Sequence, residues 1–93
     1  MTLTDDTIVT IDEANITSET IAEYKSRIKA VELGENIESV ANDTFKNIST
    51  LESVKLNYAG ETGNYAFGEN NALTKVVLGE NVTSIGNHQF AEC

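Results

Sequence analysis

The segment LTKVVLGENVTSIGNHQFAEC, from Leu73 to Cys93, decides the fold, because two earlier segments of the chain repeat its pattern. The first of these spans residues 28–50 and the second spans residues 51–72. Four sets of apolar residues align when the three segments are stacked: Ile28, Leu51 and Leu73; Val31, Val54 and Val76; Leu33, Leu56 and Leu78; Phe45, Phe67 and Phe90. A period of 22 to 23 residues is typical of a solenoid, in which each repeat stacks on its neighbours and depends on them for stability.

Each repeat is expected to contain two strands joined by a turn. Alternation of the Val-x-Leu type, as in Val31 and Leu33, predicts a first strand with both apolar side chains pointing inward. Gly34-Glu35-Asn36 and Gly79-Glu80-Asn81 are predicted turns, because glycine and asparagine tolerate left-handed backbone geometry. A second inward pair then follows each turn: Ile37 with Val40, and Val82 with Ile85.

The middle repeat departs from this pattern. Counting back from Phe67, Ala59 and Thr62 take the places of Ile37 and Val40, and the turn is one residue shorter. Its second strand is therefore predicted to be the weakest part of the array. We expect the ring of Tyr58 to fill the space that these smaller side chains leave.

The first 27 residues do not match the repeat and are predicted to form an N-terminal cap of one strand and one helix. The β-branched run from Thr7 to Ile11 is the predicted strand. Thr17 suits the N-cap of the helix, whose apolar face would include Ile21 and Tyr24. The chain is thus interpreted as one domain, with a cap over residues 1–27 and repeats over residues 28–93.

Composition limits the function classes. The net charge of −9, with only six lysines and arginines, argues against nucleic acid as a partner, since phosphates require a basic footprint. Apolar runs of a few residues predict no membrane span, and the first twenty residues show no signal peptide. A single cysteine cannot form a disulfide bond within the chain, so the cysteine count does not distinguish an oxidising from a reducing compartment. Four Asn-x-Ser/Thr sequons occur, beginning at Asn15, Asn42, Asn47 and Asn81. They would be glycosylation sites in a secreted eukaryotic protein, and otherwise they are coincidences of composition.

The sequence predicts no catalytic residue, no metal site and no cofactor. His88 is the only histidine, which leaves few routes to acid–base catalysis, and we expect it to be a loop residue. Cys93 aligns with Ile48 and Asn70 and is predicted to occupy a ladder position between repeats. The densest acidic pairs are Asp5 with Asp6 and Asp12 with Glu13, and no calcium-loop pattern follows them. The sequence also contains no glycine motif of the phosphate-binding type.

The repeats resemble the BspA-type leucine-rich repeats, whose consensus is roughly L-x-x-V-x-L-P-x-x-V-x-x-I-G-x-x-A-F-x-x-C. The third repeat carries most of it, and the second retains Gly63, Ala66 and Phe67; the third has Leu73, Val76, Leu78, Val82, Ile85, Gly86, Phe90 and Cys93. The chain departs from the consensus in having no proline and in its middle repeat. The resemblance covers residues 28–93 and implies a β-rich, right-handed leucine-rich-repeat solenoid.

The resemblance also implies a secreted or cell-surface protein that acts in adhesion or protein binding, with no common catalytic site. A host or extracellular-matrix protein is the partner that it suggests. The alternative is a structural spacer or assembly scaffold that positions another domain. An enzyme is the third class, and the single histidine and the missing motifs argue against it.

The outward face of the first strands is the candidate binding surface. Alternation places residues between the inward-facing valines and leucines on this face, and Glu32 should lie beside Lys55 on the neighbouring strand. Three strands make a patch smaller than the roughly 800 Å² per partner of a standard interface. The candidate residues are Glu32, Ser53, Lys55, Asn57, Lys75 and Val77.

The third repeat is predicted to leave an open end. The chain stops at Cys93, on a repeat boundary, without a polar segment that would act as a cap. The strand edge from Lys75 to Leu78 should then be unpaired and its apolar side chains partly exposed. Exposed edges and apolar patches favour pairing, so we expect a two-fold homodimer through this repeat.

Overall fold

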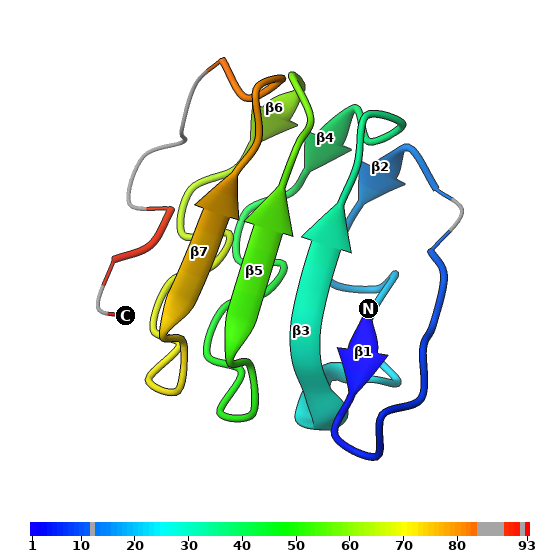
Figure 1. The fold of residues 1–93 in the computed structure, drawn as a ribbon, viewed down its shortest axis with the longest axis vertical. Coiled ribbons are helices and arrows are strands. Elements are labelled where there is room, and N and C mark those ends of the chain that lie inside the picture. The colour runs from blue at the N-terminus through cyan, green and yellow to red at the C-terminus, as the bar shows by residue number, and fades with distance from the viewer. Residues whose placement is uncertain (12, 84–88, 92) are drawn as a thin grey trace.

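A computed structural model describes residues 1–11, 13–83, 89–91 and 93, which form two sheets that enclose the core between them. The first sheet has the strand order β1-β3-β5-β7 and the second the order β2-β4-β6. Figure 1 shows the short strands of the second sheet as a row behind the tips of β3, β5 and β7. The strands are β1 (Thr2–Leu3), β2 (Asn15–Ile16), β3 (Ile28–Leu33), β4 (Ser39–Val40), β5 (Ser53–Leu56), β6 (Glu61–Thr62) and β7 (Lys75–Leu78).

The repeats pair in parallel and in the predicted register. Val31 lies beside Val54, and Val54 lies beside Val76, so each repeat adds one strand to the first sheet. On β3 and β5 these valines and the leucines two positions later are buried. The three predicted first strands and the alignment of the repeats are therefore confirmed.

The aligned phenylalanines form a stack through the core. The ring centroids of Phe45 and Phe67 lie 5.1 Å apart with nearly parallel planes, and those of Phe67 and Phe90 lie 5.5 Å apart. Phe45 and Phe67 are fully buried, whereas Phe90 is half-buried. The aromatic ring of each repeat thus packs on the ring of the next, as the alignment predicts.

The ladder position three residues after each phenylalanine is also confirmed. Asn70 is fully buried, and its Nδ2 donates hydrogen bonds to the carbonyl oxygens of Phe45 (2.9 Å) and Phe67 (2.7 Å). Its Oδ1 accepts a hydrogen bond from the backbone nitrogen of Ile48 at 2.6 Å. Cys93 stands in the same relation to the second repeat, because its Sγ donates to the carbonyl oxygen of Phe67 at 3.2 Å. Polar groups here join the backbones of adjacent repeats.

The middle repeat follows the prediction only in part, because Ala59, the predicted inward counterpart of Ile37, is exposed. Thr62 lies beside Val40 in the second sheet, in the place where the first repeat has an apolar side chain. Tyr58 is buried, and its hydroxyl group shares a hydrogen bond with the hydroxyl group of Thr62. Burial raises the pKa of Tyr58, and the hydrogen bond to Thr62 opposes that shift. The tyrosine fills the space left by the smaller residues and satisfies the threonine hydroxyl group.

The turns are not built as the sequence predicts. The chain does turn after Gly34 and Gly79, where the backbone nitrogens of Ile37 and Val82 donate to their carbonyl oxygens at 3.1 Å and 3.2 Å. No glycine among the described residues has a positive φ, so the prediction of left-handed geometry at these turns is wrong. A Cβ atom at Gly79 would lie 2.3 Å from Oδ1 of Asn57, so this glycine is needed for space. Left-handed geometry falls instead on non-glycine residues at two aligned positions: Asp43 and Tyr65 (φ 60° and 56°), and Asn47 and Glu69 (φ 55° and 56°).

The N-terminal segment differs from the predicted strand and helix. The run from Thr7 to Ile11 forms only an isolated bridge between Ile8 and Thr2, because the antiparallel partner of β3 is β1. No α-helix occurs within residues 1–11, 13–83, 89–91 and 93. In place of the predicted helix from Thr17 the chain makes successive turns and a short 3-10 helix, η1 (Lys25–Arg27).

The apolar residues of this segment still join the core. Ile21, which the sequence places on the apolar face of the predicted helix, is fully buried although that helix does not form. Ile16 is also fully buried and lies beside Val40, so β2 adds a parallel strand to the second sheet before the first predicted repeat begins. The division at residue 27 between cap and repeats stays a prediction.

Candidate functional site

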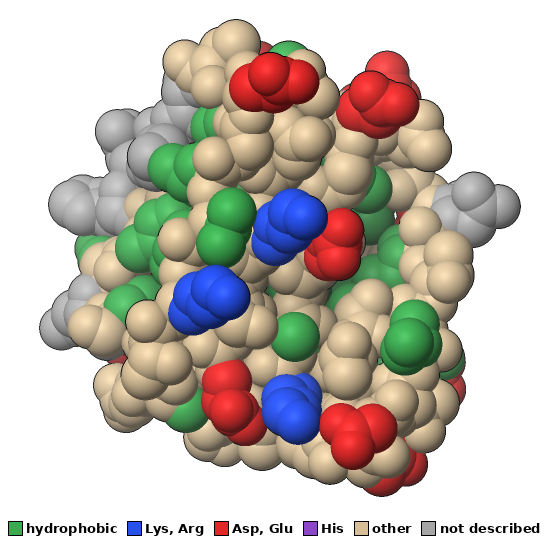
Figure 2. All heavy atoms as spheres, viewed as in Figure 1, with side chains coloured by type: hydrophobic (Ala, Val, Ile, Leu, Met, Phe, Trp, Pro, Cys, Tyr) green, Lys and Arg blue, Asp and Glu red, His purple; other side chains and the backbone are tan. Residues whose placement is uncertain are grey.

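The outward face of the first sheet brings most of the predicted site residues together. Ser53 lies beside Lys75, and Lys55 lies between Glu32 and Val77, each in the register that the repeat alignment predicts. Figure 2 shows this face, with basic side chains near its middle and most acidic side chains toward its margins. The patch is a short array of mixed charge with an apolar residue at the β7 side.

A hollow of about 350 Å³ opens on this face. The β strands supply its floor, and the N-terminal segment supplies one wall through Met1, Thr2 and Ile8. The Ile8 side chain is 76% exposed, and Val77 at the other side of the hollow is 38% exposed. The hollow therefore spans the sheet from β1 to β7, with apolar groups at its two sides and charges between them.

Sequence reasoning missed the N-terminal wall of this hollow. Thr2 and Ile8 belong to a segment without repeat pattern, and only the antiparallel pairing of β1 with β3 brings them to the sheet. The backbone of Met1 also holds that of Val9 through hydrogen bonds of 2.8 Å and 2.7 Å. Burial lowers the pKa of the Met1 ammonium group, and the negative charge of Glu32 opposes this shift.

The charged residues of the hollow differ in their partners. Lys55 Nζ lies 3.9 Å from Oε1 of Glu32, and both side chains are more than half exposed. Lys75 is exposed and forms no salt bridge with any residue that the structure describes. Lys75 therefore presents an ammonium group without a carboxylate partner beside the apolar side chain of Val77.

The Glu32–Lys55 pair is expected to contribute only about 0.2–0.5 kcal/mol to stability, because water screens two exposed side chains. A double-mutant cycle of Glu32→Gln and Lys55→Gln, measured by urea denaturation, checks this value. A coupling free energy above about 1 kcal/mol would show that the pair is a structural element rather than part of an accessible surface.

Asn57 lies apart from the other candidate residues. It follows β5 and is half-buried, and its Oδ1 accepts a hydrogen bond from the backbone nitrogen of Asn81 at 3.0 Å. Asn57 is absent from the lining of the hollow. The structure thus gives its side chain a part in holding the turn of the next repeat. Its alignment with Gly34 and Gly79, both at turns, is the signal that could have shown this.

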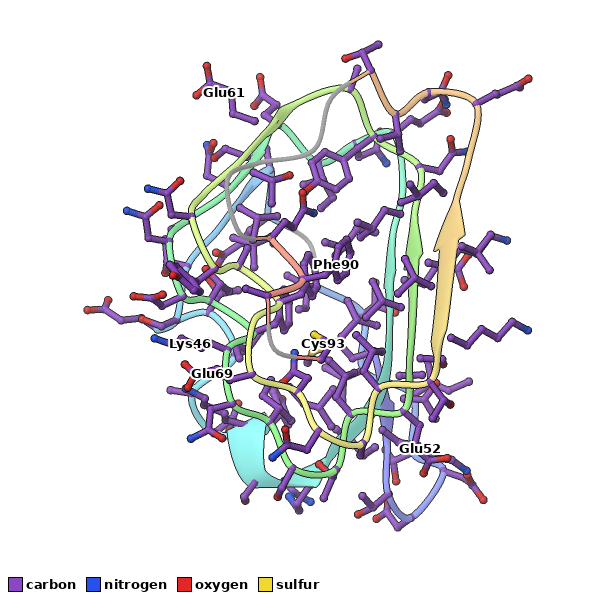
Figure 3. All side chains as sticks on the ribbon, turned by 90° about the vertical axis from the view of Figure 1, so that its left-hand side faces the viewer. Lys46, Glu52, Glu61, Glu69, Phe90 and Cys93 are labelled. Atoms are coloured by element: carbon purple, nitrogen blue, oxygen red, sulfur yellow. The ribbon has the colours of Figure 1, made fainter. Side chains whose placement is uncertain are left out.

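A second charged cluster lies on the side of the molecule opposite the first sheet (Figure 3). Lys46 Nζ lies 3.0 Å from Glu69 and 3.9 Å from Asp43, and 5.1 Å from the centroid of the Tyr65 ring. Figure 3 shows Lys46 and Glu69 next to one another on this side. The hydrogen bond and the charge of Glu69 raise the pKa of Lys46. Lys46 belongs to the first repeat and Glu69 to the second, so their ion pair connects adjacent repeats.

The described part of the chain shows no cluster of side chains that could bind a metal ion. His88 and Asp12 lie outside the described residues, so their positions are not part of the structure. Within the described part of the chain, no three His, Cys, Asp or Glu side chains come close enough to hold a metal ion. Nor does that part contain a helix with the length and apolar character needed to cross a membrane.

Comparison with known families gives one match. The sequence model described as "BspA type Leucine rich repeat region (6 copies)" matches residues 7–93. The match begins well before Ile28, where the sequence pattern alone placed the first repeat, and includes β2. Repeats of this family are generally protein-binding and typically non-enzymatic, in proteins that are typically secreted or on the surface. Comparisons with curated proteins and with solved structures find no significant match.

Proposed function

Because this chain belongs to the BspA-type leucine-rich repeat family, we propose that it is a non-enzymatic adhesion or protein-binding module of a secreted or cell-surface protein. Its repeats form a right-handed solenoid, since parallel strands joined by crossover connections are right-handed in about 98% of cases. The N-terminal segment acts as the cap, because β1 covers the edge of β3.

The observation that carries this proposal is the hollow on the outward face of the first sheet. It is lined by Ile8 and Val77 at its sides and by Glu32, Lys55 and Lys75 between them. Apolar side chains with a few charged groups between them suit a protein segment better than a uniformly charged ligand. Lys75, which has no carboxylate partner among the described residues, fits a carboxylate of the bound segment.

The size of the face favours weak binding by one module. A hollow of about 350 Å³ receives a few side chains, and a standard interface needs roughly 800 Å² from each partner. The same observation supports the alternative function, a structural spacer or scaffold that positions another domain. The two functions differ in whether the outward face itself contacts a partner.

Binding by the outward face is tested with the immobilised chain and a panel of extracellular-matrix proteins as probes. Lys75→Glu is expected to weaken binding at least tenfold, because it reverses the charge beside the apolar side of the hollow. Lys25→Glu is the matched control, since it makes the same change of charge in η1 and lies outside the hollow.

Three outcomes separate the functions. Loss of binding with Lys75→Glu and retention with Lys25→Glu supports binding through the outward face. An equal loss with both variants would show that net charge, and not the hollow, controls binding. Absence of binding to every probe, with a folded chain by circular dichroism, would favour the spacer or scaffold.

A further inference from the structure

We propose, on the basis of the binding function above, that the hollow on the outward face takes an extended acidic segment of a partner protein. A carboxylate of this segment lies over Ser53, and an apolar side chain of the segment packs on Ile8. Both residues line the hollow, and the backbone pairing of the strands places them in one row. The shape, the charge and the hydroxyl groups of this row favour such a segment.

The row crosses the strands of the first sheet and forms the floor of the hollow. Three small side chains, those of Thr2, Ala30 and Ser53, lie between longer side chains at its two ends. With neighbouring strands about 4.8 Å apart, the row is roughly 19 Å long, which is the length of about six residues of extended chain. Its members, in spatial order, are Ile8, Thr2, Ala30, Ser53 and Lys75.

Two lysines flank the place over Ser53. Lys75 is the partner of Ser53 on the neighbouring strand, and Lys55 follows Ser53 two positions later on β5 and points to the same face. These positions are about 4.8 Å and about 7 Å from Ser53 along the backbone, within the reach of a lysine side chain. A carboxylate over Ser53 therefore lies between two ammonium groups.

The local charge of the hollow is opposite to that of the whole chain. Among the described residues that line it, Lys55 and Lys75 outnumber the one acidic residue, Glu32. The chain as a whole carries a net charge of −9. Complementary charge positions a bound segment and fixes its register, so the lysines select a segment with a carboxylate at this place.

The floor also offers hydroxyl groups to a bound segment. Ser53 and Thr2 are both half-buried, and neither hydroxyl group makes a hydrogen bond within the part of the chain that the structure describes. A hydroxyl group can donate one hydrogen bond and accept others. The Ser53 hydroxyl group can thus donate to the bound carboxylate, and that of Thr2 to a carbonyl oxygen of the segment.

Two other classes of ligand fit the hollow less well. None of the described residues that line it is aromatic, so nucleic-acid bases find no ring on which to stack. A polyanion needs a continuous basic footprint, but the carboxylate of Glu32 lies 3.9 Å from Lys55 Nζ. A single carboxylate carried by a protein segment suits two lysines better than a chain of anionic groups.

Glu32 limits the strength of this binding. Its carboxylate competes with an incoming carboxylate for Lys55 and also repels it. Glu32→Gln is therefore expected to raise the affinity for an acidic segment about threefold, since an exposed pair of this kind is weak. A purely structural role of the Glu32–Lys55 pair would leave the affinity unchanged or lower it.

Fluorescence anisotropy with labelled peptides tests the proposal. The reference peptide carries a leucine and a glutamate about four residues apart, because these face the same side of an extended chain and span roughly 14 Å. Three strand spacings separate Ser53 from Ile8 by a similar distance, roughly 14 Å. Glutamine in place of the glutamate is expected to weaken binding at least tenfold, and a peptide with the two residues adjacent should also bind more weakly.

Ser53→Tyr is expected to abolish binding of the reference peptide, because the ring would fill the floor of the hollow while tyrosine suits a strand. Ser49→Tyr is the matched control, since Ser49 is exposed and lies outside the hollow. It should leave the affinity unchanged, and circular dichroism checks that both variants fold.

The outcomes separate this proposal from the binding function on which it rests. Equal binding of the glutamate and glutamine peptides would overturn the acidic partner, and retained binding by Ser53→Tyr would overturn the place. A sulfated polysaccharide that binds more tightly than the peptide, and is lost with Ser53→Tyr, would replace the segment by a polyanion. If no peptide binds at millimolar concentration but matrix proteins bind in a manner that depends on Lys75, the partner class is wrong and the binding function stands. Absence of binding to every probe would overturn both.

Discussion

Phe67→Ala is expected to lower the free energy of unfolding by about 4 kcal/mol, the largest effect of any single truncation in this chain. The Phe67 ring is fully buried between those of Phe45 and Phe90, at centroid distances of 5.1 Å and 5.5 Å. Its removal would leave a cavity and cost two ring contacts at once. The total stability of a domain of this size is about 5–15 kcal/mol, so the variant would be close to unfolding.

Urea denaturation of a truncation series measures this effect. Phe45→Ala should cost about 3 kcal/mol, because its ring is fully buried but stacks on only one other phenylalanine. Phe90→Ala should cost less than either, since this side chain is half-buried. Phe67→Leu is the control that keeps most of the volume. A larger loss for Phe90→Ala than for Phe67→Ala would contradict the assignment of the centre of the stack.

Asn70→Ala is expected to destabilise the chain by roughly 3 kcal/mol or more, although it removes a small polar side chain. The amide group makes three hydrogen bonds, all to backbone atoms: the nitrogen of Ile48 and the carbonyl oxygens of Phe45 and Phe67. Each buried backbone group left without a partner costs about 1–3 kcal/mol. The Phe67 oxygen retains its hydrogen bond from Cys93, so two groups lose their partner completely.

Asn71→Ala is the matched control, because the neighbouring asparagine is exposed and should tolerate the change within about 0.5 kcal/mol. Asn70→Asp keeps the shape but replaces the donating nitrogen with oxygen. Burial and the two facing carbonyl groups would raise the pKa of the introduced carboxyl group in the folded state. Its destabilisation should then be greatest at neutral pH and decrease as the pH falls through that raised pKa. A variant as stable as the wild type would show that Asn70 is not the link between these backbones.

The repeat units and their order followed from the sequence because their signals are local and recur. Val-x-Leu alternation marks β3, β5 and β7, and the alignment of the three segments sets which residues become neighbours, including Glu32 with Lys55. The exchange of Val40 for Thr62 in the middle repeat was predictable for the same reason. So was the burial of Tyr58, because a gap in one repeat must be filled by its own residues.

The N-terminal segment could not be predicted in this way. β1 and β2 have two residues each, too few for any periodicity to show. Thr7 to Ile11 has the composition of a strand but no ladder partner along its length, and β3 pairs with Thr2–Leu3 instead. The site was therefore only partly predictable, since Ile8 becomes the wall of the hollow through a pairing distant in sequence.

By itself, the sequence determined the repeat, the direction of its side chains and the position of the aromatic stack, because hydrophobic periodicity acts within each unit of 22 to 23 residues. Only the tertiary structure decided how the first residues close one edge of the sheet and where the hollow lies. It also decided that Asp43, Asn47, Tyr65 and Glu69, and not the glycines, take left-handed geometry. These features depend on backbone contacts between units, and such contacts leave little trace in the residues that make them.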